Sequence, residues 1–321
     1  MKIKITLIFI GTLIIFGCKK TKTVQKQGFT AINPLSYTDV VYIADKDEVI
    51  ASTYDGSIYT LTKQGSKELL INIADEIYGM QYSKSRHKAY ITTYRSGVLV
   101  IDLAKRAVIK KIEVGKGNWL VNLRLSDNER YLSGLGVRKN NYIWDLNADY
   151  HRIEILDQLP NHFIRHISDD GKAYFQTFDK YSIWDIEKGV VLEEIPVFGK
   201  IDDIDSKGNS VALYDNRFFF YDRDKKRILY EKKHPYLIFQ EANGDTLHDP
   251  YQLKLLYSKI IKDKIYTVGL DKSIRVWRKS NGDLLDEWVA HKATISGFDV
   301  SRDKSQWVTV DLKGGVIFKD L

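Results

Sequence analysis

The strongest constraint on this chain is a motif that returns at a nearly fixed interval. In its best copies an aromatic residue stands between an apolar residue and an aspartate, as in Ile143-Trp144-Asp145-Leu146 and Ile183-Trp184-Asp185-Ile186. Looser copies carry another aromatic or aliphatic residue at this anchor position. The seven anchors are Tyr59, Ile101, Trp144, Trp184, Tyr221, Trp277 and Phe318. Their spacing is 37 to 43 residues, apart from one interval of 56.

A second marker keeps the same phase as the anchors. A charged or polar turn precedes each anchor, at residues 45–47, 85–86, 127–128, 169–171, 207–209, 262–264 and 302–304. Between turn and anchor lie β-branched and aromatic runs such as Ala89-Tyr90-Ile91-Thr92, which are typical of strands. A unit of about 43 residues has the size of one four-stranded propeller blade. We therefore predict an all-β fold, a seven-bladed β-propeller of four-stranded antiparallel blades over residues 28–321.

The two ends of the repeat predict how the ring closes. The last unit stops at Leu321, three residues after its anchor, and so lacks an outer strand. The segment Phe29–Leu35 precedes the first unit and needs a partner. We expect this N-terminal strand to pair as the outer strand of the last blade.

The repeat units resemble degenerate WD repeats over essentially all of residues 28–321. The best unit runs from Thr267 to Trp277. In that family a Thr or Ser, an Asp and a Trp link strands within a blade, and the resemblance assigns these positions to Thr267, Asp271 and Trp277. The family's fourth member is an upstream histidine, and His248 lies about one residue from its place. The last unit has Ala290-His291 where the family has Gly-His, and Phe318 at the Trp position.

The first residues are predicted to be a targeting segment. Met1–Lys4 is basic, and the apolar stretch Ile5–Phe16 suits a signal peptide but is too short to span a bilayer. It ends in Ile15-Phe16-Gly17-Cys18, which resembles the lipobox of bacterial lipoproteins. The resemblance implies a signal peptide over residues 1–17, cleavage before Cys18, and lipid, including palmitate, on that cysteine. Cys18 is the only cysteine, so no disulfide forms within one copy.

Residues 18–27 are interpreted as a flexible tether. They hold four lysines and no apolar periodicity. The lysines either add weak attraction to anionic head groups or simply keep the linker soluble. No acidic residue follows Cys18 directly, and by family analogy this favours the bacterial cell envelope at the outer membrane, facing the periplasm.

Charge and motifs exclude several classes of function. The formal net charge is +7, with the charges interspersed rather than clustered, so nucleic-acid binding is not expected. His162 and His166 are spaced to share one strand face but lack a third metal ligand. Asp202, Asp203 and Asp205 do not have the spacing of an EF-hand loop. With no hydrolase, haem or phosphate-loop motif, we predict no enzyme, no cofactor and no metal.

The interval of 56 residues marks an insertion around residues 232–251. Insertions in repeat proteins map to loops on one face, often the binding face. Tyr236, Phe239 and Tyr251 suit a contact surface, although a longer hairpin packed on its own blade would also explain the length. Trp119 lies in the loop that leads into a blade, where it is either a contact residue or part of the core. These four residues form the candidate binding loop.

The function predicted from the sequence is a membrane-anchored propeller that binds a protein or another ligand in the cell envelope. We expect a monomer with an envelope protein as partner. The alternatives are a propeller hydrolase, lactonase-like, with a metal in the central channel, and a ligand sensor that uses the channel mouth. The enzyme alternative requires acidic or histidine side chains that converge in the channel.

Overall fold

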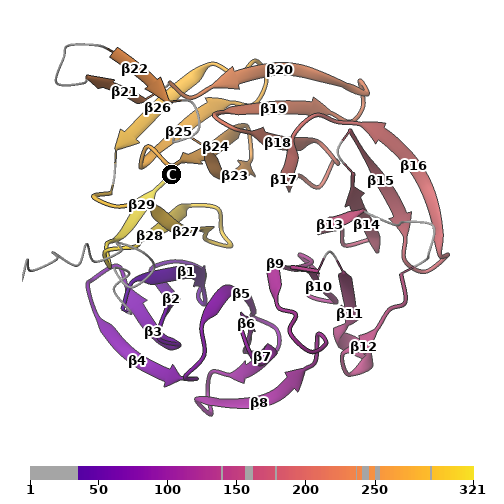
Figure 1. Ribbon diagram of the computed structural model, residues 1–321, viewed down its shortest axis with the longest axis vertical. Helices are drawn as coiled ribbons and strands as arrows, with labels where there is room; N and C mark the ends of the chain where they lie inside the picture. The colour runs from indigo at the N-terminus through magenta and orange to yellow at the C-terminus, as the bar shows by residue number, and fades with distance from the viewer. Residues whose placement is uncertain are drawn as a thin grey trace, which may run out of the picture. The chain divides into compact units, whose positions relative to one another are not determined.

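Seven small antiparallel sheets follow one another around a ring (Figure 1). The computed structural model describes residues 35–138, 140–155, 162–177, 179–235, 237–240, 246–249, 254–289 and 291–321, with only the backbone described at 237–240 and 246–249. The predictions for the signal peptide, for Cys18, for the tether and for residues 29–34 of the closing strand lie outside the described residues.

The first four blades each consist of four strands in sequence order. Blade one holds β1 (Tyr37–Tyr42), β2 (Glu48–Thr53), β3 (Ser57–Thr62) and β4 (Lys67–Asn72). Blade two holds β5 (Ile77–Ser83), β6 (Lys88–Thr93), β7 (Gly97–Asp102) and β8 (Ala107–Ile112). Blade three holds β9 (Leu120–Leu125), β10 (Tyr131–Gly136), β11 (Asn141–Asp145) and β12 (His151–Arg152). Blade four holds β13 (Phe163–Ile167), β14 (Lys172–Gln176), β15 (Lys180–Asp185) and β16 (Val190–Pro196).

The remaining blades include the insertion. Blade five holds β17 (Lys200–Ile204), β18 (Ser210–Tyr214), β19 (Arg217–Asp222) and β20 (Arg227–Lys233). A two-stranded hairpin follows, β21 (Leu237–Gln240) with β22 (Thr246–Asp249). Blade six holds β23 (Leu255–Ile261), β24 (Lys264–Gly269), β25 (Ser273–Arg278) and β26 (Leu284–Val289). Blade seven holds, in the described part of the chain, β27 (Ile295–Val300), β28 (Gln306–Asp311) and β29 (Val316–Asp320).

Helix is almost absent from this fold. Among the described residues, a single 3-10 turn, η2 (Leu146–Ala148), follows β11, with Asp145 as its N-cap. Nowhere in the described ranges is there a helix with the length and apolar content needed to cross a bilayer.

The predicted architecture of seven four-stranded blades is confirmed, and the anchor motif marks the third strand of every blade. Tyr59, Ile101, Trp144, Trp184, Tyr221, Trp277 and Phe318 lie on β3, β7, β11, β15, β19, β25 and β29 respectively. Most anchors are buried, with Trp144 and Trp184 among the largest fully enclosed side chains. The anchor is repeated because each third strand needs a large apolar side chain against its neighbour.

The predicted charged turns join the first strand of each blade to the second. Every one of them contains, or directly precedes, a residue with positive φ: Asp47, His87, Glu129, Gly171, Gly208, Lys262 and Lys304. Only two of the seven are glycine, although a left-handed residue other than glycine costs roughly 1 kcal/mol or more. The turn geometry is therefore repeated more faithfully than the sequence that forms it.

The apolar core is divided into seven clusters, one between each pair of neighbouring blades. The cluster between the last and first blades joins Val308 and Val310 of β28 to Val40, Val49 and Ala51 of blade one. A blade has two apolar faces and buries each against a neighbour, so a closed ring leaves no face uncovered.

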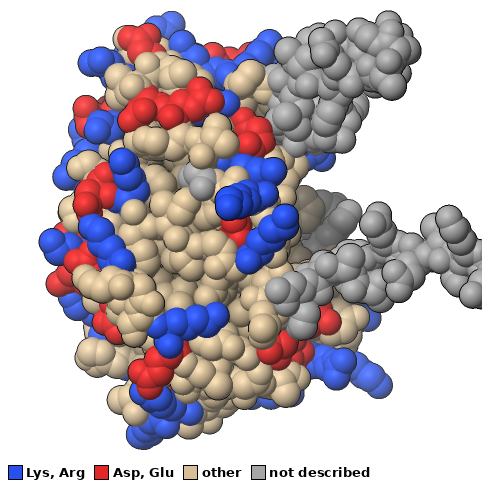
Figure 2. Space-filling view, turned by 90° about the vertical axis from the view of Figure 1, so that its left-hand side faces the viewer, with Lys and Arg blue, Asp and Glu red and all other residues tan. Residues whose placement is uncertain are grey.

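Hydrogen bonds reinforce the seam between blades seven and one. The amide of Tyr42 donates to Asp299 Oδ2 at 2.9 Å, and the Tyr42 hydroxyl donates to Gln306 Oε1 at 3.0 Å. Lys63 pairs with Asp320 at 2.8 Å near the outer edge. Figure 2 shows the flank that the first and last blades form, where positive and negative side chains are interspersed around an uncharged area.

The side-chain network expected from the WD resemblance is present in blade six, with one correction. Trp277 Nε1 donates to Thr267 Oγ1 at 2.8 Å, and His234 Nε2 lies 2.7 Å from the same oxygen. His234 Nδ1 lies 3.8 Å from Asp271 Oδ2. The histidine is therefore His234, and the assignment to His248, which lies on β22, was wrong because the hairpin separates the network histidine from β23.

Blade seven repeats part of this network. His291 Nδ1 lies 3.0 Å from Asp311 Oδ2, and His291 Nε2 lies 2.7 Å from Thr309 Oγ1. Phe318 stands at the Trp position and has no N–H to add, so the hydroxyl of Thr309 is bridged from one side only.

Candidate binding rim

The antiparallel order of the strands defines two rims. Connections from second to third strands, and from one blade to the next, lie at one rim; the other connections lie at the opposite rim. The aromatic rim comprises described residues 35–36, 54–56, 73–76, 94–96, 113–119, 137–138, 197–199, 215–216, 234–235, 254, 270–272, 291–294 and 312–315, with the strand ends beside them. The ion-paired rim comprises residues 43–47, 63–66, 84–87, 103–106, 126–130, 146–150, 168–171, 186–189, 205–209, 223–226, 262–263, 279–283 and 301–305.

Exposed aromatic side chains are confined to the aromatic rim. In the described part of the chain, the aromatic residues with the greatest exposure are Tyr78 (38%), Tyr94 (42%), Phe198 (41%) and Tyr214 (41%). Each lies in or next to a connection of this rim. Large aromatic surface left in contact with water is characteristic of protein-binding surfaces.

Three of the rim aromatics form a cluster that joins blades two and three, which we call the Trp119 cluster. Trp119 precedes β9, Tyr78 lies near the start of β5, and Tyr94 follows β6. Ring centroids are 4.8 Å apart for Tyr94 and Trp119, and 6.4 Å apart for Tyr78 with either partner. Trp119 itself is half-buried, so the predicted contact residue is both part of the rim surface and packed against its neighbours.

The loop that carries Trp119 is fixed by a buried amide. Asn118 donates from Nδ2 to the carbonyl of Val114 at 3.1 Å and to the Tyr142 hydroxyl at 2.8 Å. The backbone carbonyl of Trp119 accepts the amide of Val137 at 3.0 Å. The cluster therefore rests on an ordered support, which lowers the entropy lost when a partner binds.

Phe198 and Tyr214 form a second cluster on blade five. Their ring centroids are 4.7 Å apart, and Phe219 packs against Phe198 at 5.3 Å. The insertion begins beside this cluster: the amide of His234 donates to Asn216 O at 2.7 Å. At its other end, the amide of Leu255 donates to Asp215 O at 2.8 Å.

The aromatic rim also carries cations that lack an acidic partner among the described residues. Six exposed Lys and Arg side chains on this rim make no ion pair with a described residue: Arg95, Lys116, Arg138, Lys254, Lys292 and Lys313. Some acids of the rim form ion pairs, as Glu113 does with Lys111 at 3.1 Å and Asp271 with Arg275 at 2.7 Å, and others cap turns. Asp75 Oδ2, for example, accepts the amides of Arg95 at 3.1 Å and Ser96 at 3.0 Å. Hydrogen bonds from turn amides and hydroxyls likewise hold the pKa of Asp55 below its usual range, against the opposing effect of burial.

The ion-paired rim differs in that many of its charges bind one another, although the exposed Lys46, Lys207, Lys262 and Lys304 make no ion pair with a described residue. Its pairs include Lys84–Asp45, Lys105–Asp102, Arg130–Asp145, Lys172–Asp170, Lys188–Asp185, Lys225–Asp222, Lys279–Asp205 and Arg302–Glu129. Glu129 is the most enclosed of these acids. Its carboxylate also accepts Ser83 Oγ at 2.6 Å and the amide of Ser85 at 3.0 Å. Although burial opposes ionisation, these bonds lower the pKa of Glu129 to about 2.

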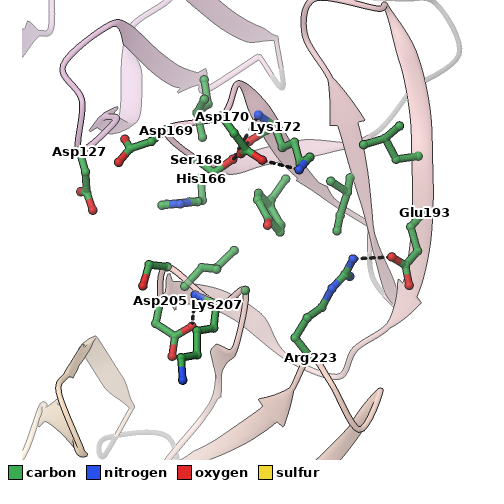
Figure 3. A pocket seen from close by; sticks show the side chains of 17 residues that line it. Asp127, His166, Ser168, Asp169, Asp170, Lys172, Glu193, Asp205, Lys207 and Arg223 are labelled. Atoms are coloured by element: carbon green, nitrogen blue, oxygen red, sulfur yellow. Dashed lines mark hydrogen bonds and ion pairs between the residues drawn. The ribbon is translucent and has the colours of Figure 1, made fainter.

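A polar cavity of about 540 Å³ opens at this second rim between blades four and five. Figure 3 shows two charge pairs among its side chains, Lys172 with Asp170 and Arg223 with Glu193, whereas Asp127 and Lys207 make no ion pair with a described residue. Asp205 Oδ1 accepts the amide of Lys207 at 2.9 Å. The charged groups of the cavity are thus largely satisfied within the protein.

The inner strands carry aspartates that link neighbouring blades. Asp39 Oδ2 accepts the amide of Met80 at 2.7 Å, and Asp203 Oδ2 accepts the amide of Ile260 at 2.7 Å. Asp202 accepts the amide of Ser258 at 2.5 Å. These carboxylates bind backbone of the next blade, and no group of three or more metal-ligating side chains occurs among the described residues.

The predicted histidine pair does not form one site. A bulge between Ile164 and His166 interrupts the regular alternation of β13, and His162 lies before that strand. His166 lines the cavity, where burial lowers its pKa to about 4.

The sequence predicted part of this site. Trp119 lies on the aromatic rim as a loop residue, and the hairpin of β21 and β22 is a connection of the same rim. Tyr236 and Tyr251 lie outside the described residues, and Phe239 is placed only by its backbone on β21. Tyr78, Tyr94, Phe198, Tyr214 and the cations were missed.

A repeat signal could have indicated the rim. In five blades an apolar residue directly follows the second strand: Tyr54, Tyr94, Val137, Leu270 and Leu312. Their amides donate to Ser36, Glu76, Trp119, Lys254 and Thr294 respectively, just before each inner strand. Turns are usually polar, so an apolar residue repeated at this position indicates a surface site that is used for contact.

Comparison with known structures gives the same class of fold. The WD40 repeats of RRP9 match with a TM-score of 0.71 and 15% identity, covering 90% of this chain and 95% of that one. The structure of U3-55K matches at 0.70 and 15%, covering 90% and 96%. The WD40 β-propeller domain of Doa1 matches at 0.67 and 13%, covering 89% and 93%. The chain therefore has a WD40-like seven-bladed propeller fold; no protein-family model and no curated protein matches its sequence.

Proposed function

We propose that this protein is a lipid-anchored scaffold of the bacterial cell envelope that binds a protein partner through its aromatic rim. The observation that supports it most directly is that the most exposed aromatic side chains of the described residues all lie at one rim, in its connections or at the strand ends beside them. The WD40-like fold supports this proposal, because a rigid ring presents many loops on one face. The inner-strand aspartates support a non-enzymatic role, since they bind backbone between blades.

The predicted anchor gives the proposal a direction. A closing strand at residues 29–35, antiparallel to β29, would run from the ion-paired rim to the aromatic rim before it enters β1. The tether from Cys18 would then leave at the ion-paired rim. In this arrangement the aromatic rim faces away from the outer membrane, toward partners in the periplasm.

Site-specific photo-crosslinking in bacterial cells tests the binding face. A benzoylphenylalanine placed at Tyr94 is expected to give a discrete crosslinked product, and the same group at Lys304, on the ion-paired rim, is expected to give none. Both positions are exposed, so accessibility is matched. Equal products from both positions, or a product from Lys304 alone, would contradict the proposal.

The anchor is tested separately with an alkyne-labelled palmitate fed to the same cells. The full chain should incorporate the label and sediment with outer membranes, whereas Cys18→Ser should do neither. Labelling that persists in Cys18→Ser, or its absence from the unchanged chain, would reject the lipoprotein assignment.

A further inference from the structure

We infer that the partner contributes an acidic segment with aromatic side chains, and that this segment docks on the Trp119 cluster. The inference rests on the proposed function and adds the chemistry of the partner and the place where it binds. Its elements are three aromatic rings in mutual contact, three exposed cations beside them, and the engagement of the described carboxylates in the adjoining turns.

The cations are placed by the backbone next to the rings. Arg95 follows Tyr94 directly, and Lys116 belongs to the same short loop as Trp119. Arg138 follows Val137, whose amide donates to the Trp119 carbonyl at 3.0 Å, and the Arg138 guanidinium lies over Gly117 of the Trp119 loop. Three positive charges therefore surround a surface of about three rings.

The neighbouring acids are already engaged, including Glu113 of the Trp119 loop, which pairs with Lys111 at 3.1 Å. Asp75 is buried and caps the turn that carries Arg95. Glu76 accepts the Tyr78 hydroxyl at 2.9 Å. Because no described acid pairs with the three cations, their charge is available to a partner, and carboxylates are the complementary groups.

The rings favour a protein segment over a membrane as the occupant. Tyr78 and Tyr94 are only about two-fifths exposed; Tyr78 stacks on Trp119 and Tyr94 packs against it at a tilt, so together they present ring edges and faces of a shallow, rigid surface. Such a surface fits aromatic side chains of a partner in edge-to-face contact. Insertion into a bilayer would instead require apolar side chains that project from the rim.

Binding to defined copolymers tests the inference on the purified chain without its signal peptide and lipid. The probes are poly(Glu,Tyr), poly(Glu) and poly(Lys,Tyr), measured by fluorescence anisotropy at 50 and 200 mM salt. We expect the protein to bind poly(Glu,Tyr) at least tenfold more tightly than poly(Glu), and not to bind poly(Lys,Tyr). Binding should weaken at the higher salt concentration.

Two triple variants separate local from total charge. R95E/K116E/R138E reverses the cations of the Trp119 cluster and should weaken poly(Glu,Tyr) binding at least tenfold. K207E/K262E/K304E reverses three exposed cations of the ion-paired rim, changes the net charge equally, and should weaken binding less than twofold. Equal losses in both variants would overturn the inference, because binding would then follow net charge alone.

Separate measurements test whether the aromatic rings contribute to binding and whether a membrane, rather than a protein segment, occupies the site. Tyr94→Ala should remove most of the preference for poly(Glu,Tyr) over poly(Glu); an unchanged preference would overturn the role of the rings. Tight binding to vesicles containing phosphatidylglycerol, without binding to poly(Glu,Tyr), would overturn the inference in favour of a membrane. A crosslinked partner at Tyr94 that has no acidic segment would refute this inference and leave the proposed scaffold intact.

Discussion

The two rims of the propeller are built from the same seven repeats and use their polar groups in opposite ways. On the ion-paired rim, Lys and Arg side chains meet carboxylates of the same or a neighbouring blade, as in Arg130 with Asp145 at 3.1 Å. On the aromatic rim, acids such as Asp75 cap turns, and the six exposed cations without ion pairs to described residues include three that surround the Trp119 cluster. The ion-paired rim also has exposed cations without such pairs, Lys46, Lys207, Lys262 and Lys304, but no exposed aromatic side chain beside them among the described residues. The difference indicates that one rim stabilises the fold and the other is available for binding.

Paired tyrosines on one strand give the largest expected contrast. Tyr90 on β6 is fully buried between blades two and three, and Tyr94 just beyond that strand is exposed on the aromatic rim. Tyr90→Ala should lower the free energy of unfolding by about 4 kcal/mol, because it leaves a cavity in the core. Tyr94→Ala should change it by less than about 1 kcal/mol. Urea denaturation followed by far-UV circular dichroism measures both.

The same pair of variants tests whether the exposed aromatic residues of the rim are available for binding or serve the fold. If Tyr94→Ala destabilised the protein as much as Tyr90→Ala, the rim aromatics would be structural. Their exposure would then need no binding partner to explain it.

Glutamates on opposite rims provide the second contrast. Glu129 is buried and accepts hydrogen bonds from two serines and Arg302, so Glu129→Ala should cost about 3 kcal/mol in unfolding free energy by leaving these donors unpaired. Glu76, on the aromatic rim, accepts only the Tyr78 hydroxyl among the side-chain contacts described, and Glu76→Ala should cost under about 1 kcal/mol. Similar losses of unfolding free energy in the two variants would contradict the conclusion that charged side chains stabilise the fold mainly at the ion-paired rim.

The same carboxylate predicts an acid limit to stability. Its pKa lies near 2 in the folded protein, below the ordinary value of 4.5, so its contribution is present above pH 4.5. That contribution is lost as the pH falls from 4.5 through 2. Glu129→Gln should flatten this part of the stability profile, measured by urea denaturation at a series of pH values.

Asp39, on an inner strand between the two rims, predicts a smaller pH dependence of stability with the opposite sign. Burial raises the pKa of this inner-strand carboxyl from 3.8 to about 7, against the two backbone amides that it accepts. The folded state therefore holds the proton more tightly than the unfolded state, and stability should decline as the pH rises from about 4 to about 7. We expect a loss of roughly 2 kcal/mol over this interval, since a tenfold change in proton affinity corresponds to about 1.4 kcal/mol and structural relaxation reduces the total.

Thermal unfolding at pH 5 and pH 8 checks this prediction. The change in midpoint from pH 5 to pH 8 should be compared between the unchanged chain and Asp39→Asn, because the lowered pKa values of the buried His166, His234 and His291 raise stability over the same interval. The unchanged chain should lose more stability, or gain less, over this interval than Asp39→Asn. The same change in both chains would show that Asp39 is ionised throughout.

The sequence predicted the fold well because each copy of the repeated motif corresponds to one blade of the propeller. Each anchor, such as Trp144 or Trp184, fills the same place between blades, so the period of the anchors is the period of the sheets. The charged turns were found for a similar reason, since each of them contains or directly precedes a residue with positive φ. His234 was missed because the network depends on a position in space, and the hairpin of β21 and β22 changes its distance along the chain.

The candidate site was predicted less completely. Trp119 was identified because it stands outside the anchor register. Tyr78 and Tyr94 have the same residue type as many buried tyrosines, and their exposure depends on which end of a strand they occupy. Ion pairing across blades, as between Arg302 and Glu129, depends on ring closure and has no signal in the local sequence.

The turns of the ion-paired rim give the smallest effect and the sharpest test of repeat geometry. Lys304 and Gly171 occupy equivalent places in two of these turns, with φ of 54° and 74°. Lys304→Gly should stabilise the protein by about 1 kcal/mol, because glycine adopts this conformation without strain. Gly171→Ala should destabilise it by a similar amount, since an added Cβ would meet its nearest atom, Tyr131 Oη, at an ordinary 3.5 Å and only the backbone strain is introduced. Opposite shifts of similar size in the urea midpoint would show that the two turns have equivalent backbone geometry.

The control variant Lys304→Ala keeps the backbone strain but removes the charge, so it should leave the midpoint nearly unchanged. If it reproduced the gain of Lys304→Gly, the gain would come from charge rather than from backbone conformation.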